Sequence, residues 1–153
     1  MGKARTSVTW SSPAKRALRR RIADAAEAAL RQARALSGEM TVVLTDSRRI
    51  RRLNARFAGE DHVTDVLAFP SSLPPPSTGA RYFGDIVIAV PRARRQARQR
   101  GVPLPQELAL LTVHGTLHLL GYVHARPAER RRMWKVQAAA LRRLGLDPER
   151  LGP

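Results

Sequence analysis

Residues 82–90 read YFGDIVIAV and form the most apolar segment of the chain, a pattern that predicts a β-strand. Pro91 follows directly and predicts the start of a short helix that ends near Gly101. A second helix is expected to begin at Pro103 or Pro105 and to continue, with a leucine-rich stripe, as far as Gly121. The strand is therefore expected to lead into two consecutive helices.

The segments on either side of this region alternate between strand and helix patterns. Strands are predicted at 6–10 (TSVTW), 40–45 (MTVVLT) and 63–69 (VTDVLAF), and helices at 12–37, 46–58 and 127–144. Three consecutive prolines predict a loop at 71–79. These counts predict an α/β (α+β) fold, in which a small mixed four-stranded sheet is covered by about five helices within a single domain of residues 1–153.

The composition indicates a folded protein with a polyanionic partner. Lys and Arg total 28 against 12 Asp and Glu, which gives a net charge of +16, and all but three of the cations are arginines. Arginine pairs bidentately with phosphate, so nucleic acid is the expected partner. A genome-wide preference for arginine codons is the alternative explanation, but it would replace Lys by Arg without raising the net charge this far.

Several classes of protein are disfavoured by what the sequence lacks. It contains no cysteine, which excludes disulfides, thiolate metal sites and a cysteine nucleophile. No apolar run approaches the roughly 20 residues that span a bilayer, and residues 1–10 lack the apolar core of a secretory signal. We therefore expect a cytoplasmic protein without membrane contact. The sequence predicts no oligomeric state.

Three of the four histidines fall within the eleven residues HGTLHLLGYVH, at 114–124. His114 and His118 are four residues apart and lie on one face of the predicted helix. Gly121 occupies the position where a helix commonly ends in a left-handed conformation, which allows His124 to fold back toward the other two. Three converging imidazoles with an open fourth position are typical of a catalytic zinc site, so we expect one Zn²⁺ per chain.

The same spacing occurs in the metzincin protease pattern, with one chemical difference. Gly115 stands where those enzymes place the glutamate that acts as general base, and a glycine cannot accept a proton. Met133 is the only methionine downstream, and it lies in a predicted helix, whereas metzincins place a methionine in a turn beneath the metal. These differences argue against a metal-dependent peptidase.

Three blocks together resemble the YbeY-type family of bacterial rRNA maturation factors, which are zinc-dependent endoribonucleases. HGTLHLLGYVH resembles the family signature H-G-x-L-H-L-x-G-Y-D-H. LNARFAGEDHVTDVLAFP (53–70) is similar to L-N-x-x-Y-R-x-K-D-x-P-T-D-V-L-S-F-P, and FGDIVIAV (83–90) is similar to a block containing L-G-D-I-V-I. The resemblance implies a single-strand-specific, metal-dependent endoribonuclease in rRNA processing, including 16S rRNA 3′-end maturation and quality control of the small subunit. It also implies that His114, His118 and His124 are the metal ligands.

Two positions depart from the family pattern. Ala58 stands where the family has an arginine that is taken as part of its active site, and Val123 replaces the aspartate before the last histidine. The first change removes a cation that could bind phosphate, and the second removes a carboxylate that could orient a ligand. Arg51 and Arg56 are nearby on the same predicted helix, but neither is an obvious replacement.

The remaining roles are assigned from residue type and position. The arginine-rich segment PRARRQARQR (91–100) is the first candidate for contact with the RNA backbone, through Arg92, Arg95 and Arg98. No side chain is identified as catalytic, and a zinc-bound water is the proposed nucleophile, with direct attack by the ribose 2′-OH as the alternative. A non-catalytic, zinc-containing ribosome-assembly factor is the second hypothesis for the function, and Ala58 favours it.

Overall fold

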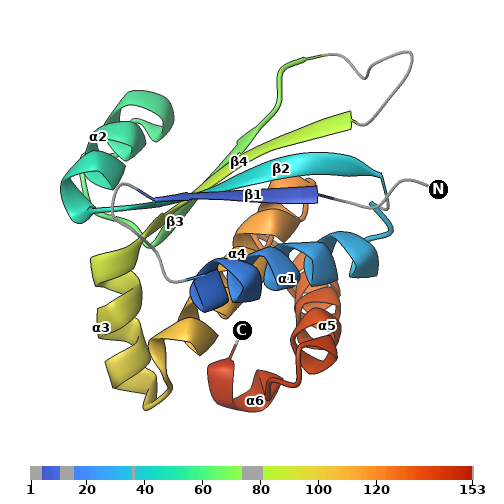
Figure 1. Cartoon of the computed structure of the whole chain (residues 1–153). Helices are drawn as coiled ribbons and strands as arrows, with labels where there is room; N and C mark the ends of the chain where they lie inside the picture. The colour runs from blue at the N-terminus through green and yellow to red at the C-terminus, as the bar shows by residue number, and fades with distance from the viewer. Residues whose placement is uncertain (1–4, 11–15, 36, 74–80, 153) are drawn as a thin grey trace.

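The computed structural model describes residues 5–10, 16–35, 37–73 and 81–152. The elements follow one another as the sequence predicts, with one additional short helix at the end of the chain (Figure 1). The strands are β1 (Arg5–Trp10), β2 (Gly38–Thr45), β3 (Val66–Pro70) and β4 (Arg81–Ala89). The helices are α1 (Arg16–Gln32), α2 (Ser47–Ala58), α3 (Val90–Arg100), α4 (Leu104–Leu119), α5 (Pro127–Arg143) and α6 (Pro148–Leu151).

The four strands form one mixed sheet in the order β1-β2-β4-β3. β1 and β4 both pair with β2 in parallel, and β3 pairs antiparallel with β4 at the other edge. The ladder between β2 and β4 shifts register after Glu39, because Met40 pairs with Gly84 and leaves Phe83 as an extra residue. The prediction of a small mixed four-stranded sheet is confirmed.

Alternation along the central strand divides the core between the two faces of the sheet. Ile86 and Ile88 lie in the cluster covered by α1 and α4, whereas Val87 and Ala89 lie in the cluster covered by α2. Figure 1 shows α2 on one side of the sheet and α1, α4 and α5 on the other. A further apolar cluster joins α1, α4 and α5, so α4 is enclosed between the sheet and a second layer of helices.

Three details of the predicted elements are corrected by the structure. The first helix ends at Gln32 and not at residue 37. The third strand begins at Val66 and not at residue 63, because the Asp65 carboxylate accepts a hydrogen bond from the Val66 amide and holds the preceding residues in a loop. α6 was not predicted, and its four residues pack Leu151 into the helical layer. The expected helix start at 12–15 and most of the loop at 71–79 lie outside the described residues.

The lengths and apolarity of the helices also bear on membrane contact. Within the described part of the chain, no helix is both long enough and apolar enough to span a bilayer.

Candidate metal centre

The central helix α4 is buried on nearly all sides, and its two histidines are the exceptions. Every residue from Glu107 to Leu119 is buried apart from His114 and His118, which are partly exposed. A helix that is apolar around its whole circumference belongs in a core, so two polar side chains at i and i+4 mark its only open strip along these residues. The site is therefore built on a rigid element.

The turn after α4 brings the third histidine back to this strip. Gly121 has φ of +96°, and its amide donates to the carbonyl of His118, while the Tyr122 amide donates to the carbonyl of Leu117. This pair of bonds closes the helix end in the manner of a Schellman motif, which favours glycine because of its positive φ. The chain reverses, as the sequence predicts, and His124 lies beside the helical pair.

The three imidazoles form a tight cluster. One ring nitrogen from each of His114, His118 and His124 can be chosen so that all three atoms lie within 4.8 Å of one another. The Nε2 atoms of His114 and His118 are 3.0 Å apart, and the His124 ring centroid is 5.7 Å from that of His114 and 4.9 Å from that of His118. The predicted convergence of the three side chains is confirmed.

Hydrogen bonds on the far side of two rings fix which nitrogen faces the cluster. The Nδ1–H of His114 donates to Oε1 of the buried Gln137 at 2.8 Å, and the Nδ1–H of His118 donates to the carbonyl of Tyr122 at 2.9 Å. Both Nε2 atoms therefore direct lone pairs into the cluster. Burial lowers the pKa of both histidines, and the proximity of His114 lowers the pKa of His118 further, which keeps the imidazoles neutral.

This arrangement fits a divalent metal ion. Two neutral imidazoles with lone pairs opposed at 3.0 Å repel each other unless a cation lies between them. Ligand nitrogens at 2.0–2.1 Å from a tetrahedral ion lie about 3.3 Å apart, so small shifts of these rings would let them share one ion. Histidine ligands oriented by an amide oxygen and a backbone carbonyl are typical of metal sites, and imidazole suits zinc, copper or nickel.

Gly115 lies between the two helical histidines at the point where α4 meets the sheet. A Cβ at this position would lie 2.9 Å from Cγ2 of Val66 and 3.4 Å from Cδ1 of Ile86. The helix therefore packs closely against β3 and β4 here, and a larger residue would require the Val66 side chain or the helix to shift. The absence of a glutamate, noted in the sequence, thus has a steric basis in this fold.

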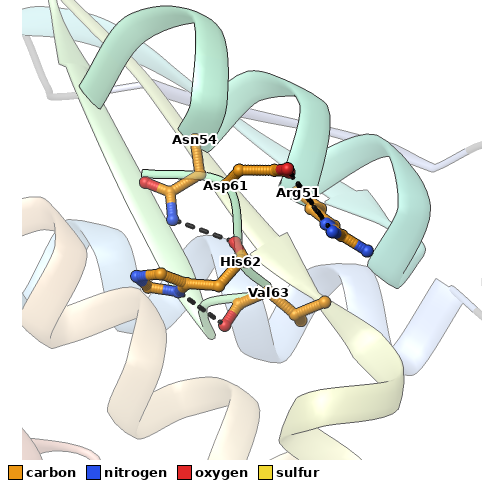
Figure 2. Close-up of polar contacts among 5 residues, drawn as sticks. All are labelled: Arg51, Asn54, Asp61, His62 and Val63. Carbon is orange, nitrogen blue, oxygen red and sulfur yellow. Dashed lines mark hydrogen bonds and ion pairs between the residues drawn. The ribbon is translucent and has the colours of Figure 1, made fainter. Parts of the chain in front are cut away.

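The loop between α2 and β3 carries the second family block and is held by side-chain contacts (Figure 2). The buried Asn54 donates from Nδ2 to the carbonyl of His62 at 3.0 Å, and Arg51 forms an ion pair with Asp61 at 2.9 Å. His62 bonds through Nε2 to the Glu60 carboxylate and lies outside the histidine cluster. Arg51 therefore already forms an ion pair with Asp61, which argues against Arg51 as a substitute for the family arginine that Ala58 replaces.

The two departures from the family pattern lie on the surface. Ala58 is the last residue of α2, exposed, and followed by Gly59 with φ of +72°. Val123 is 47% exposed in the turn before His124. Because Gln137 and the Tyr122 carbonyl orient two of the rings, the orientation of His114 and His118 does not need a carboxylate at position 123.

Three acidic side chains contact neighbouring residues. Asp65 accepts from the Val66 amide and from Nε2 of Gln96, and the Asp85 carboxylate bonds to the hydroxyl of Tyr82. Glu107 is fully buried and pairs with Nε of Arg100 at 3.1 Å on α3.

The arginines predicted to contact RNA lie on α3, opposite its buried alanines. Arg95 and Arg98 are exposed and Arg92 is partly exposed, while Ala93 and Ala97 pack into the core. The histidine cluster is bordered instead by Arg130 and Trp134 of α5. Sequence reasoning did not identify Gln137 or Trp134, because their place beside the site depends on how α5 packs against α4.

Comparisons with known proteins find similar sequences and a similar fold. The family model described as endoribonuclease YbeY matches residues 5–145. Curated relatives named endoribonuclease YbeY include one from Anaeromyxobacter sp. (strain Fw109-5), which is 42% identical over 88% of this chain and 69% of the relative's length. Another, from Rhodopseudomonas palustris, is 45% identical over 72% of this chain and 60% of the relative's length. The solution structure of TM1509 from Thermotoga maritima superposes with a TM-score of 0.56 at 22% identity, covering 92% of this chain and 91% of that one, and shows the same fold.

Proposed function

The chain belongs to the endoribonuclease YbeY family, and from that premise we propose that it cleaves RNA phosphodiester bonds at the histidine cluster with the help of a bound zinc ion. The observation that carries the proposal is the convergence of His114, His118 and His124 at the open strip of α4, with two rings oriented from behind. Their residue types and spacing match the family signature position by position.

The three histidines would hold the ion and leave one coordination position open. A bound zinc ion supplies Lewis-acid chemistry and lowers the pKa of a coordinated water. Gln137 and the Tyr122 carbonyl keep the ring nitrogens of His114 and His118 aimed at the ion. The burial of these two rings lowers their pKa, so they remain available as ligands at neutral pH.

We assign binding of the RNA backbone to arginine side chains. We assign the first contacts to Arg92, Arg95 and Arg98 on α3, because they share the solvent-facing side of a helix whose other side is buried. Each would neutralise a phosphate and position the strand without reading its sequence. The net charge of +16 supplies long-range attraction for any RNA.

The finer assignment follows the family. The substrate would be ribosomal RNA of the small subunit, including the 3′ end of 16S rRNA, and the reaction would take place in the cytoplasm, where ribosomes are assembled. The family resemblance supports this assignment, and the arginine-rich composition is compatible with it.

A second candidate function is that of a non-catalytic ribosome-assembly factor. It is favoured by Ala58, which leaves an exposed methyl group where the family has an arginine, and by the pairing of Arg51 with Asp61. A peptidase is disfavoured, because Gly115 cannot act as a general base and a side chain at this position would press against Val66.

The test uses purified protein loaded with zinc and incubated with structured rRNA and, separately, with casein. We expect cleavage of rRNA that is lost in His114→Ala, together with stoichiometric zinc in the wild type by elemental analysis. His62→Ala is the matched control, since it removes a histidine that lies outside the cluster and bonds to Glu60. RNA binding without cleavage in the wild type would establish the assembly-factor function, and cleavage of casein alone would establish a peptidase.

A further inference from the structure

A pocket of about 240 Å³ opens directly beside the histidine cluster. Its lining consists of His114 and His124 on one side and of Arg130, Met133, Trp134 and Gln137 on the other. The four α5 residues are spaced i, i+3, i+4 and i+7, so they share one face of that helix. The pocket thus lies between the proposed metal ligands and a single face of α5.

The lining combines an apolar interior with a cation. Met133 is buried, Trp134 is partly exposed, and the surface of the pocket is mostly carbon. Arg130 is exposed and donates to the carbonyls of His124 and Ala125, which holds its guanidinium next to the third histidine. Gln137 lines the pocket and also accepts from His114, so the pocket and the cluster share a wall.

We propose that this pocket binds one unpaired nucleobase of the RNA strand adjacent to the scissile phosphate, with the Trp134 indole stacking on the base and Arg130 contacting the backbone. The inference rests on the proposed function. It adds a specificity element that the metal ligands cannot provide, because an ion held by three histidines recognises a phosphate but does not distinguish paired from unpaired RNA.

The dimensions and chemistry of the pocket favour a base. Its volume lies below the roughly 300–1,000 Å³ of pockets that enclose drug-sized ligands, which suits one ring system and not a whole nucleotide. Base–aromatic stacking tolerates any sequence, because every base presents a π-face. A base inside a duplex is already paired and stacked, so this pocket would select single-stranded RNA.

The chain permits a direct binding test, because it contains only two tryptophans, Trp10 and Trp134. In a Trp10→Phe background, the fluorescence of Trp134 reports on its own surroundings. Metal-free protein is titrated with a short single-stranded RNA and with a duplex that contains the same strand. We expect the single strand to quench Trp134 in a saturable manner and the duplex to leave it unchanged. Equal quenching by both, or none by either, would overturn the proposal.

Affinities of variants of the natural sequence, measured by fluorescence anisotropy of labelled RNA, give a second readout. Trp134→Leu should weaken binding of the single strand about 5- to 150-fold, which corresponds to about 1–3 kcal/mol per stacked base, and Trp134→Phe should retain most of the affinity. Duplex binding should be the same in all three proteins. Lys135→Ala is the matched control, because it removes an exposed charge from the neighbouring position and should lower the affinity for the single strand and for the duplex equally.

Urea unfolding of each variant separates a loss of fold from a loss of stacking. If Trp134→Leu folds normally and lowers the affinity for both RNAs to the same extent as Lys135→Ala, the pocket does not bind a base. This failure is distinguishable from failure of the proposed function, which would appear as intact binding by Trp134 without any cleavage by the zinc-loaded wild type.

Discussion

Replacing Gln137 by leucine tests whether the hydrogen bond behind His114 controls metal affinity. Gln137 is 2% exposed, and its Oε1 accepts the Nδ1–H of His114 at 2.8 Å. Leucine has a similar volume and no acceptor, so the packing of α5 against α4 is largely kept. We expect weaker zinc binding with little change in the stability of the metal-free protein.

The magnitude follows from where the proton of His114 can go. In the metal-free variant the imidazole can shift its proton to Nε2, which lies 3.0 Å from Nε2 of His118 and can donate to it. With metal bound, Nε2 is a ligand, so the proton stays on Nδ1 without a partner. A buried donor left unsatisfied costs about 1–3 kcal/mol, which predicts a loss of about 5- to 150-fold in zinc affinity.

Competition with a chromophoric chelator at neutral pH measures this affinity. Gln137→Glu is the control, because it keeps an acceptor for Nδ1–H and should bind zinc at least as tightly as the wild type. Urea unfolding of the metal-free proteins checks that both variants fold. A zinc affinity of Gln137→Leu within about twofold of the wild type would refute the assignment of Gln137 as an orienting residue.

Three further outcomes are expected. Ala58→Arg should raise turnover of RNA about 30- to 1000-fold without loss of stability to urea, because position 58 is exposed at a helix end and an added cation can contact the developing charge on phosphate. Unchanged turnover would show that another residue supplies that contact. Neutralising Arg92, Arg95 and Arg98 together should reduce the slope of log affinity against log salt concentration by about 2, since each phosphate contact contributes about 0.7 for single strands. An unchanged slope would show that the RNA binds to another surface of the protein. Burial raises the pKa of Glu107 above its ordinary value of 4.5, so the Glu107 carboxyl holds its proton more tightly in the folded protein than in the unfolded chain. The free energy of unfolding therefore falls as pH rises from the unfolded pKa of Glu107 through its higher folded pKa. Glu107→Gln should therefore show a flatter decline of unfolding free energy above pH 4.5 in urea titrations, and a profile parallel to that of the wild type would contradict this origin of the pH dependence.

The parts of the fold that sequence could predict are those set by local pattern. The apolar run at 82–90 and the glycine at 121 predict a strand and a helix end from a few neighbouring residues, and the structure agrees with both. The start of β3 differs from the prediction. Val63 and Thr64 have strand propensity, but hydrogen bonds of Asn54 and Asp65 hold the residues before Val66 in a loop. The contact of Asn54 with His62 connects a helix to a loop eight residues away, which no local pattern predicts.

The same division applies to the site. The spacing of His114, His118 and His124 is a property of one helix and its terminal turn, so the sequence predicts that they converge. Gln137 and Trp134 approach the cluster only because α5 packs against α4, and a glutamine and a tryptophan on a helix carry no signal of that role. Their position depends on tertiary packing and becomes visible only in three dimensions.

The close contact at Gly115 also limits which enzymes can share this architecture. A glutamate between the two helical histidines would bring its Cβ to 2.9 Å from Cγ2 of Val66, so the helix would shift away from the β-sheet unless the Val66 side chain moves. Such a shift would open the apolar cluster that contains Ile86, Leu108 and Leu111. A protease and this protein can therefore use the same histidine spacing, while the residue between the two histidines is limited by how closely the helix approaches the sheet.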